Sequence, residues 1–116
     1  MGQFSKKYTG VRKNGEFQYL FKKGESIVTY AFVCYYKANR RRVNRLGVMA
    51  SKKVGNAVKR NRARRIIKEA FRLTNPLLLE KTDKRYDFVF VARGKTPELD
   101  SRQIYGLLIK QLLPRV

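Results

Sequence analysis

The residues of this chain that could do chemistry are mainly arginines and lysines, and they are concentrated between residues 51 and 73. Wound at about 100° per residue, the segment SKKVGNAVKRNRARRIIKEAFRL predicts one amphipathic helix. Gly55-Asn56 is a suitable entry to this helix, because Asn56 can cap free backbone N–H groups. The apolar arc of the helix contains Ala63, Ile66, Ile67, Ala70, Phe71 and Leu73, and its opposite arc contains Asn61, Arg64, Arg65, Lys68 and Arg72. Because a guanidinium group binds phosphate through two parallel hydrogen bonds, this pattern favours the binding of a polyanion.

A solvated charged face is the usual explanation for such a run, but a solvated face normally mixes the two signs of charge. Between Arg40 and Arg72 there are thirteen Lys or Arg residues and one acid, Glu69. The whole chain has 28 Lys and Arg against 8 Asp and Glu, a formal net charge of +20. This charge is typical of a nucleic-acid-binding protein. A membrane surface is the alternative partner, but it would need a bulky apolar helix face free to insert.

The protein itself has few groups that could catalyse a reaction. It contains no His, and its acids do not form the carboxylate cluster of a two-metal nuclease. Cys34 lies in an apolar run without an activating partner, so we expect a small buried hydrophobe. One cysteine cannot form a disulfide within the chain, which fits a reducing compartment. We therefore predict no catalytic residue, no metal ligand and no cofactor held by the protein.

The chain predicts one domain, residues 1–116, of the α+β class. Residues 1–12 are basic and turn-like, and we expect them to be partly flexible. Helices are predicted over 15–23, over the basic segment, and from Asp100, where Gln103 completes a capping box. Strands are predicted over 26–28, 30–36, 43–50 and 86–92. Asn75-Pro76 should end the basic helix, with one further turn at 77–79. The result is a two-layer α/β sandwich with a mixed four-stranded sheet.

The chain resembles the protein subunit of bacterial ribonuclease P. The resemblance rests on the segments Lys52-Lys53-Val54-Gly55-Asn56-Ala57-Val58, Arg60-Asn61-Arg62, Arg64-Arg65, Ile66-Ile67-Lys68 and Ala70-Phe71, on Asn14, Phe17, Phe21 and Gly24, and on the runs 32–35 and 86–93. It implies the element order αβββαβα with a left-handed β-α-β crossover around the basic helix. Crossover statistics alone would favour the right-handed form.

The resemblance also implies a function. The protein would bind a catalytic RNA and assist it in removing the 5′ leader of precursor tRNA, with magnesium held by the RNA. The residues implied to face the catalytic RNA are Asn56, Arg60, Asn61, Arg62, Arg64, Arg65 and Lys68. Those implied to bind the leader are Phe17, Phe21, Val33 and Tyr35. Four cations, Lys52, Lys53, Arg93 and Lys95, could supply phosphate contacts to the leader along the rim of that site. Aromatic faces stack unpaired bases with little sequence preference, which fits the second set, although periodicity alone would place Phe17 and Phe21 in an ordinary core.

Two other functions stay open from the residues. A general RNA-binding or ribosomal protein would explain the charge, and a protein-only nuclease would need metal-dependent cleavage without RNA. The expected partners are ribonuclease P RNA and precursor tRNA, with no membrane and no obligatory protein partner. We expect a cytoplasmic location, because the sequence has no long apolar segment and no signal peptide pattern.

Overall fold

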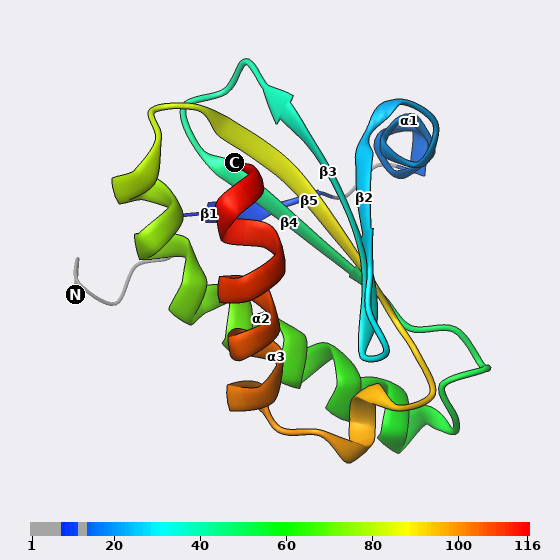
Figure 1. The fold of residues 1–116 in the computed structure, drawn as a ribbon. Coiled ribbons are helices and arrows are strands. Elements are labelled where there is room, and N and C mark those ends of the chain that lie inside the picture. Colours follow the sequence, from blue (N-terminus) through cyan, green and yellow to red (C-terminus); the bar gives the residue numbers. More distant parts are fainter. Residues whose placement is uncertain (1–7, 12–13) are drawn as a thin grey trace.

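The computed structural model describes residues 8–11 and 14–116, which form a mixed sheet with helices on both faces (Figure 1). The strands are β1 (Tyr8–Gly10), β2 (Glu25–Val28), β3 (Phe32–Asn39), β4 (Asn44–Met49) and β5 (Arg85–Ala92). Their order across the sheet is β1-β4-β5-β3-β2. β4 pairs parallel with both β1 and β5, whereas β3 pairs antiparallel with β5 and β2. The mixed sheet is confirmed, but it has five strands, not four.

The helices are α1 (Asn14–Lys23), α2 (Ala57–Lys81) and α3 (Ser101–Leu107). α3 continues through a π-helical turn, Leu108–Leu112, and a 3₁₀ turn, Leu113–Arg115. α2 and α3 cover one face of the sheet, and α1 lies on the opposite face (Figure 1). The predicted two-layer arrangement therefore holds for α2 and α3, while α1 adds a partial third layer. β4, α2 and β5 form a crossover between neighbouring parallel strands, and its left-handed sense stays a prediction.

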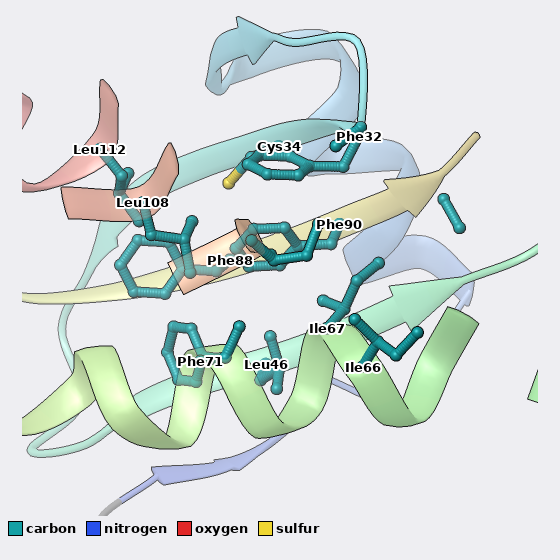
Figure 2. Packing of buried hydrophobic residues seen from close by; sticks show 14 of the residues in the cluster. Phe32, Cys34, Leu46, Ile66, Ile67, Phe71, Phe88, Phe90, Leu108 and Leu112 are labelled. Atoms are coloured by element: carbon teal, nitrogen blue, oxygen red, sulfur yellow. The ribbon is translucent and has the colours of Figure 1, made fainter. Parts of the chain in front are cut away.

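The main core lies between the sheet and the α2–α3 layer (Figure 2). Strand alternation places Cys34 of β3 beside Phe90 of β5, and both side chains are fully buried. The ring of Phe71 on α2 lies 5.2 Å from that of Phe88, measured between centroids. Burial raises the pKa of the Cys34 thiol far above its usual value. Cys34 is thus an inert core residue, as expected.

A smaller packed region lies on the other face, under α1. Leu20 of α1 is 1% exposed and fills its centre. Phe17 packs directly over the backbone of β4, where a Cβ added at Gly47 would lie 2.7 Å from Phe17 Cε1. Any side chain at Gly47 would therefore displace the aromatic ring. This glycine sets how closely α1 approaches the sheet.

The strand β1 falls in the segment predicted to be turn-like, so that prediction is wrong for Tyr8–Gly10. β1 pairs with the edge of β4, and the Tyr8 ring lies 5.0 Å from that of Phe71. Val11 follows it and donates its N–H to Leu46 O at 2.9 Å. A strand of three residues is too short to show an alternating pattern in the sequence. The residues that hold β1 in place are distant in sequence, so no local signal predicts it. The rest of that predicted segment lies outside the described residues.

α2 is entered where the sequence predicts, after Gly55-Asn56, but it ends later than predicted. It begins at Ala57, after Gly55 has turned the chain with a φ of +143°, a conformation that glycine adopts far more readily than other residues. It does not end at Asn75-Pro76 but runs through to Lys81. A tertiary hydrogen bond from Asn44 Nδ2 to Asn75 Oδ1, 2.8 Å, fixes the helix at this point, and Leu78 beyond it is buried.

The helical pattern wrongly predicts that one apolar residue of α2 is buried. Leu73 is 38% exposed, whereas Thr74 is fully buried and donates its hydroxyl to Ala70 O at 2.8 Å. Leu73 lies at the edge of the apolar arc and Thr74 near its centre, so geometry outweighs polarity. The capping box of α3 is confirmed, because Asp100 and Gln103 exchange two hydrogen bonds of 2.9 Å. No helix among the described residues is long and apolar enough to cross a membrane.

Candidate nucleic-acid interface

The basic face of α2 is open to solvent. Asn61, Arg65 and Lys68 are exposed, and within the described part of the chain none of the three forms an ion pair. Arg64 is half-buried and donates to Asn61 Oδ1 at 3.0 Å. A groove of about 460 Å³ runs along this face, lined by Tyr8, Asn61, Arg64, Arg65, Lys68, Glu69 and Arg72. The groove is cationic, because Arg64, Arg65, Lys68 and Arg72 line it together with a single acid, Glu69.

The single acid in this groove is neutralised by its neighbour. Glu69 Oε2 lies 2.7 Å from Arg72 Nη2, and this hydrogen bond lowers the pKa of the Glu69 carboxyl. Arg72 and Tyr8 were not among the predicted site residues. Arg72 could have been found, because it falls on the basic arc, but Tyr8 had no local signal. Burial raises the pKa of the Tyr8 hydroxyl, so it stays neutral beside the cations.

The first turns of α2 present a second group of predicted residues. Asn56 caps the helix, accepting the Lys59 N–H at 3.0 Å, and Arg60 is half-buried one turn later. Arg62 is exposed but donates its Nε–H to Pro97 O at 2.8 Å, which draws its guanidinium toward the turn after β5. The structure therefore places Asn61, Arg64, Arg65 and Lys68 in one groove, whereas Asn56, Arg60 and Arg62 do not line it.

The predicted aromatic residues lie together on the opposite side of the sheet. The rings of Phe21 and Tyr35 meet edge to face with centroids 4.8 Å apart. Phe17, Phe21, Val33 and Tyr35 are all half-buried, whereas Leu20 is fully buried. Phe17 and Phe21 are therefore less buried than ordinary core residues, and Leu20 takes the central position under α1. We call the surface formed by these four residues the aromatic cleft.

The aromatic cleft continues over residues that the sequence did not single out. Val91 faces the same side as Val33, because the two are partners in the β3–β5 register. Met49 is 38% exposed and pairs with Val91. Only the register between strands brings these residues together, so no single strand signals it. A hollow of about 270 Å³ follows at the end of β4, lined by Val48, Met49, Ala50, Ser51, Arg64 and Val91.

Arg64 links the two surfaces, because it lines both this hollow and the groove on α2. Its Nη2 also lies 3.4 Å from Ala50 O, at the end of β4. The predicted rim residues Lys52 and Lys53 are exposed in the loop that follows. Arg93 is exposed and donates to Thr29 O at 3.2 Å, whereas Lys95 lies 3.5 Å from the carboxylate of Glu98. Lys95 is thus the least available of the four rim cations.

The described residues include no group of three or more His, Cys, Asp or Glu side chains that could hold a metal ion. Asp87, the acid nearest the centre of the sheet, is bound by Arg45 through two hydrogen bonds. The arrangement can bind a nucleic acid along two joined surfaces, one cationic and one aromatic.

Comparisons with known proteins agree with this chemistry. The family model Ribonuclease P matches residues 4–115. The ribonuclease P protein component of Clostridium botulinum strain Langeland is 44% identical over 102 residues, covering 88% of this chain and 89% of that protein. That of Clostridioides difficile strain 630 is 39% identical over 106 residues, covering 91% and 90%.

Solved structures show the same fold. The Staphylococcus aureus RNase P protein superposes with a TM-score of 0.76 at 33% identity, covering 93% of this chain and 94% of that one. The Thermotoga maritima RNase P protein superposes with a TM-score of 0.75 at 29% identity, covering 92% and 96%. Since the family model spans nearly the whole sequence, the chain belongs to the family of ribonuclease P protein components.

Proposed function

We propose that this chain binds ribonuclease P RNA through the basic face of α2 and holds the 5′ leader of precursor tRNA in the aromatic cleft. The family is that of the protein component of a ribonucleoprotein endoribonuclease of tRNA processing. The observation that carries the proposal is the groove on α2, where Asn61, Arg65 and Lys68 are exposed and no carboxylate is left unneutralised. Such a surface is stable next to a polyanion.

A structured RNA suits the groove better than a flexible acidic protein would. The cations lie on consecutive turns of one rigid helix, so they present a row of donors at a fixed spacing. Arg64 and Arg65 supply planar guanidinium groups that can bind phosphate and stack on bases. Contacts of this kind release counterions from the RNA, so binding should weaken steeply with salt.

A single strand suits the aromatic cleft. Phe17, Phe21 and Tyr35 are half-buried, so each is held firmly yet keeps ring surface for a base. Stacking contributes about 1–3 kcal/mol per base and is tolerant of sequence, as a protein that handles many precursor tRNAs requires. Arg64 lines both the groove on α2 and the hollow next to the aromatic cleft. A leader that extends out of the cleft past Arg64 would therefore meet the RNA bound on α2.

The chemical step belongs to the RNA in this proposal. Magnesium bound by the RNA would supply the activated water and the charge stabilisation for phosphodiester hydrolysis. The protein residues would bind and orient the leader and neutralise phosphates. The isolated protein should therefore cleave nothing.

The direct test is a precursor tRNA cleavage assay at low magnesium with three samples: the protein alone, the RNA subunit alone, and both together. We expect the mature 5′ end to form efficiently only in the third sample. Unchanged processing after the protein is added would contradict the proposal. Metal-dependent cleavage by the protein alone would support a protein-only nuclease, and a footprint confined to ribosomal RNA would support a general RNA-binding protein.

A further inference from the structure

The far side of α1 holds a second hollow that the proposed function does not use. Figure 1 views α1 almost along its axis while the strands run across the picture, so α1 lies across the strands. Phe21 of α1 points toward Tyr35 on one side, and Glu16 contacts Arg45 on the other. On that other side is a hollow of about 520 Å³, lined by Gly15, Glu16, Tyr19, Leu20, Lys37, Ala38, Asn39, Arg40, Arg45 and Asp87.

The acids in the floor of this hollow are neutralised. Arg45 is 8% exposed and lies between two carboxylates, with Nη1 2.6 Å from Glu16 Oε2 and Nη2 2.7 Å from Asp87 Oδ2. Asn39 Nδ2 donates to Asp87 Oδ1 at 2.8 Å. Arg41 Nη2 lies 3.9 Å from the same Glu16 oxygen, so two guanidinium groups balance the two carboxylates. The floor therefore offers no net negative charge that would repel a phosphate.

The rim of the hollow is aromatic on one side and basic on the other. Tyr19 of α1 is 54% exposed, and Lys37 of β3 is half-buried opposite it. The connection between β3 and β4 then places Arg40 and Arg42 in solvent, and neither forms an ion pair with any residue that the structure describes. This loop is held in shape by Asn39, whose Oδ1 accepts a backbone N–H at 2.8 Å and whose Nδ2 donates to Val43 O at 3.3 Å.

We propose that this hollow, with Tyr19 and Arg40 at its rim, binds a part of the single-stranded leader farther from the cleavage site than the part in the aromatic cleft. An exposed ring beside unpaired cations is the arrangement that binds single-stranded nucleic acid. The inference rests on the proposed function and extends the same RNA path.

The direction of the path follows from the sheet. Val33, Tyr35 and Lys37 are every second residue of β3 and therefore lie on the same face of the sheet. The aromatic cleft and the hollow thus follow one another along this strand. Lys22 and Lys23 are exposed on the last turn of α1, the helix that separates the two. Arg45, near the start of β4, lines the hollow, and the loop with Lys52 and Lys53 follows the other end of this strand. The six residues of β4 span about 17 Å, so the loop and the hollow are well separated. A leader that starts at the catalytic RNA would reach the hollow last.

The experiment measures the affinity of the assembled RNA–protein enzyme for precursor tRNA with a leader of about four or about twelve nucleotides, sizes that span the common range for single-strand sites. Tyr19→Ala should weaken binding of the long leader roughly tenfold and leave the short leader unchanged. Arg40→Ala should lower the slope of log affinity against log salt by about 0.7, again only with the long leader. Arg102→Ala, which removes an exposed cation from α3, is the matched control and should change neither.

Equal losses with both leaders, or no loss with either, would overturn the inference. Phe21→Ala separates this failure from failure of the proposed function. If Phe21→Ala weakens the short leader while Tyr19→Ala has no effect on the long one, only the distal site is wrong. If Phe21→Ala also has no effect, the leader does not use the aromatic cleft, and the proposed function fails with it.

Discussion

Arg45 holds the carboxylate of Asp87 through two hydrogen bonds, from Nε to Oδ1 at 2.8 Å and from Nη2 to Oδ2 at 2.7 Å. The remaining guanidinium nitrogen reaches Glu16 on α1 at 2.6 Å. One side chain thus joins β4, β5 and the helix that carries Phe17 and Phe21. The aromatic cleft depends on this link, because it fixes where α1 lies on the sheet.

Loss of the Asp87 carboxylate should be strongly destabilising. Asp87→Ala leaves the largely buried guanidinium of Arg45 without its main partner, so we expect the free energy of unfolding to fall by about 2–4 kcal/mol. Urea denaturation measures it. Glu69→Gln is the matched control, since it breaks the exposed pair with Arg72 and should change stability very little. Similar effects of the two variants would contradict the role of the Arg45 link.

The same pair predicts a dependence of stability on pH. Burial acts to raise the pKa of Asp87, but the hydrogen bonds from Arg45 and Asn39 outweigh it and hold the pKa below its usual value. A carboxyl group with a depressed pKa in the folded state contributes stability that is present above the unfolded pKa of about 3.9. This contribution is lost as the pH falls through the folded pKa. Unfolding free energies measured from pH 5 downward should drop more steeply below about pH 4 for the unmodified protein than for Asp87→Asn. Parallel curves would show that Asp87 does not contribute.

Gly47→Ala should damage the leader site selectively. The new Cβ would lie 2.7 Å from Phe17 Cε1 and 3.4 Å from Val11 Cβ, so the Phe17 ring must move. We expect the assembled enzyme to lose several-fold in affinity for precursor tRNA, within the 1–3 kcal/mol of one stacked base, and to keep its affinity for mature tRNA. Gly106→Ala is the matched control, because an added Cβ there meets nothing within 4 Å. A loss of the same size with Gly106→Ala would rule out a specific effect at Phe17.

Binding of the protein to ribonuclease P RNA should be strongly dependent on salt. With roughly six to ten phosphate contacts, affinity should fall about 10³–10⁵-fold between roughly 50 and 200 mM salt. Lys68→Ala should lower the slope of log affinity against log salt by about one, as expected when one phosphate contact is lost. Lys110→Ala on the C-terminal helix, an exposed cation elsewhere, should leave the slope unchanged. A flat response of the unmodified protein would contradict the phosphate-binding groove.

The parts of this structure that depend on local pattern could be predicted from the sequence. The exposure of Asn61, Arg65 and Lys68 follows from helical periodicity, and the capping box of α3 follows from two residues three positions apart. The parts that depend on distant partners could not. Continuation of α2 past Pro76 depends on Asn44, which bonds Asn75 and also accepts the Tyr86 N–H at 2.7 Å.

The candidate site divides in the same way. The cationic groove was predictable because one helix supplies nearly all of it, apart from Tyr8 on β1. The half-buried state of Phe17 and Phe21 was not, because periodicity assigns them to the same face as Leu20 and only packing against Gly47 and Tyr35 distinguishes them. Likewise, Arg45 contacts residues 29 and 42 positions away, which no local pattern reveals.

The most direct test of two separate RNA-binding surfaces compares Arg65→Ala with Phe21→Ala. For each variant, two quantities are measured: the dissociation constant of the protein for ribonuclease P RNA, and the ratio of the assembled enzyme's affinities for precursor and mature tRNA. Arg65→Ala should weaken binding of the RNA subunit and leave the ratio unchanged, and Phe21→Ala should lower the ratio and leave RNA binding unchanged. The same defect in both variants would contradict the account.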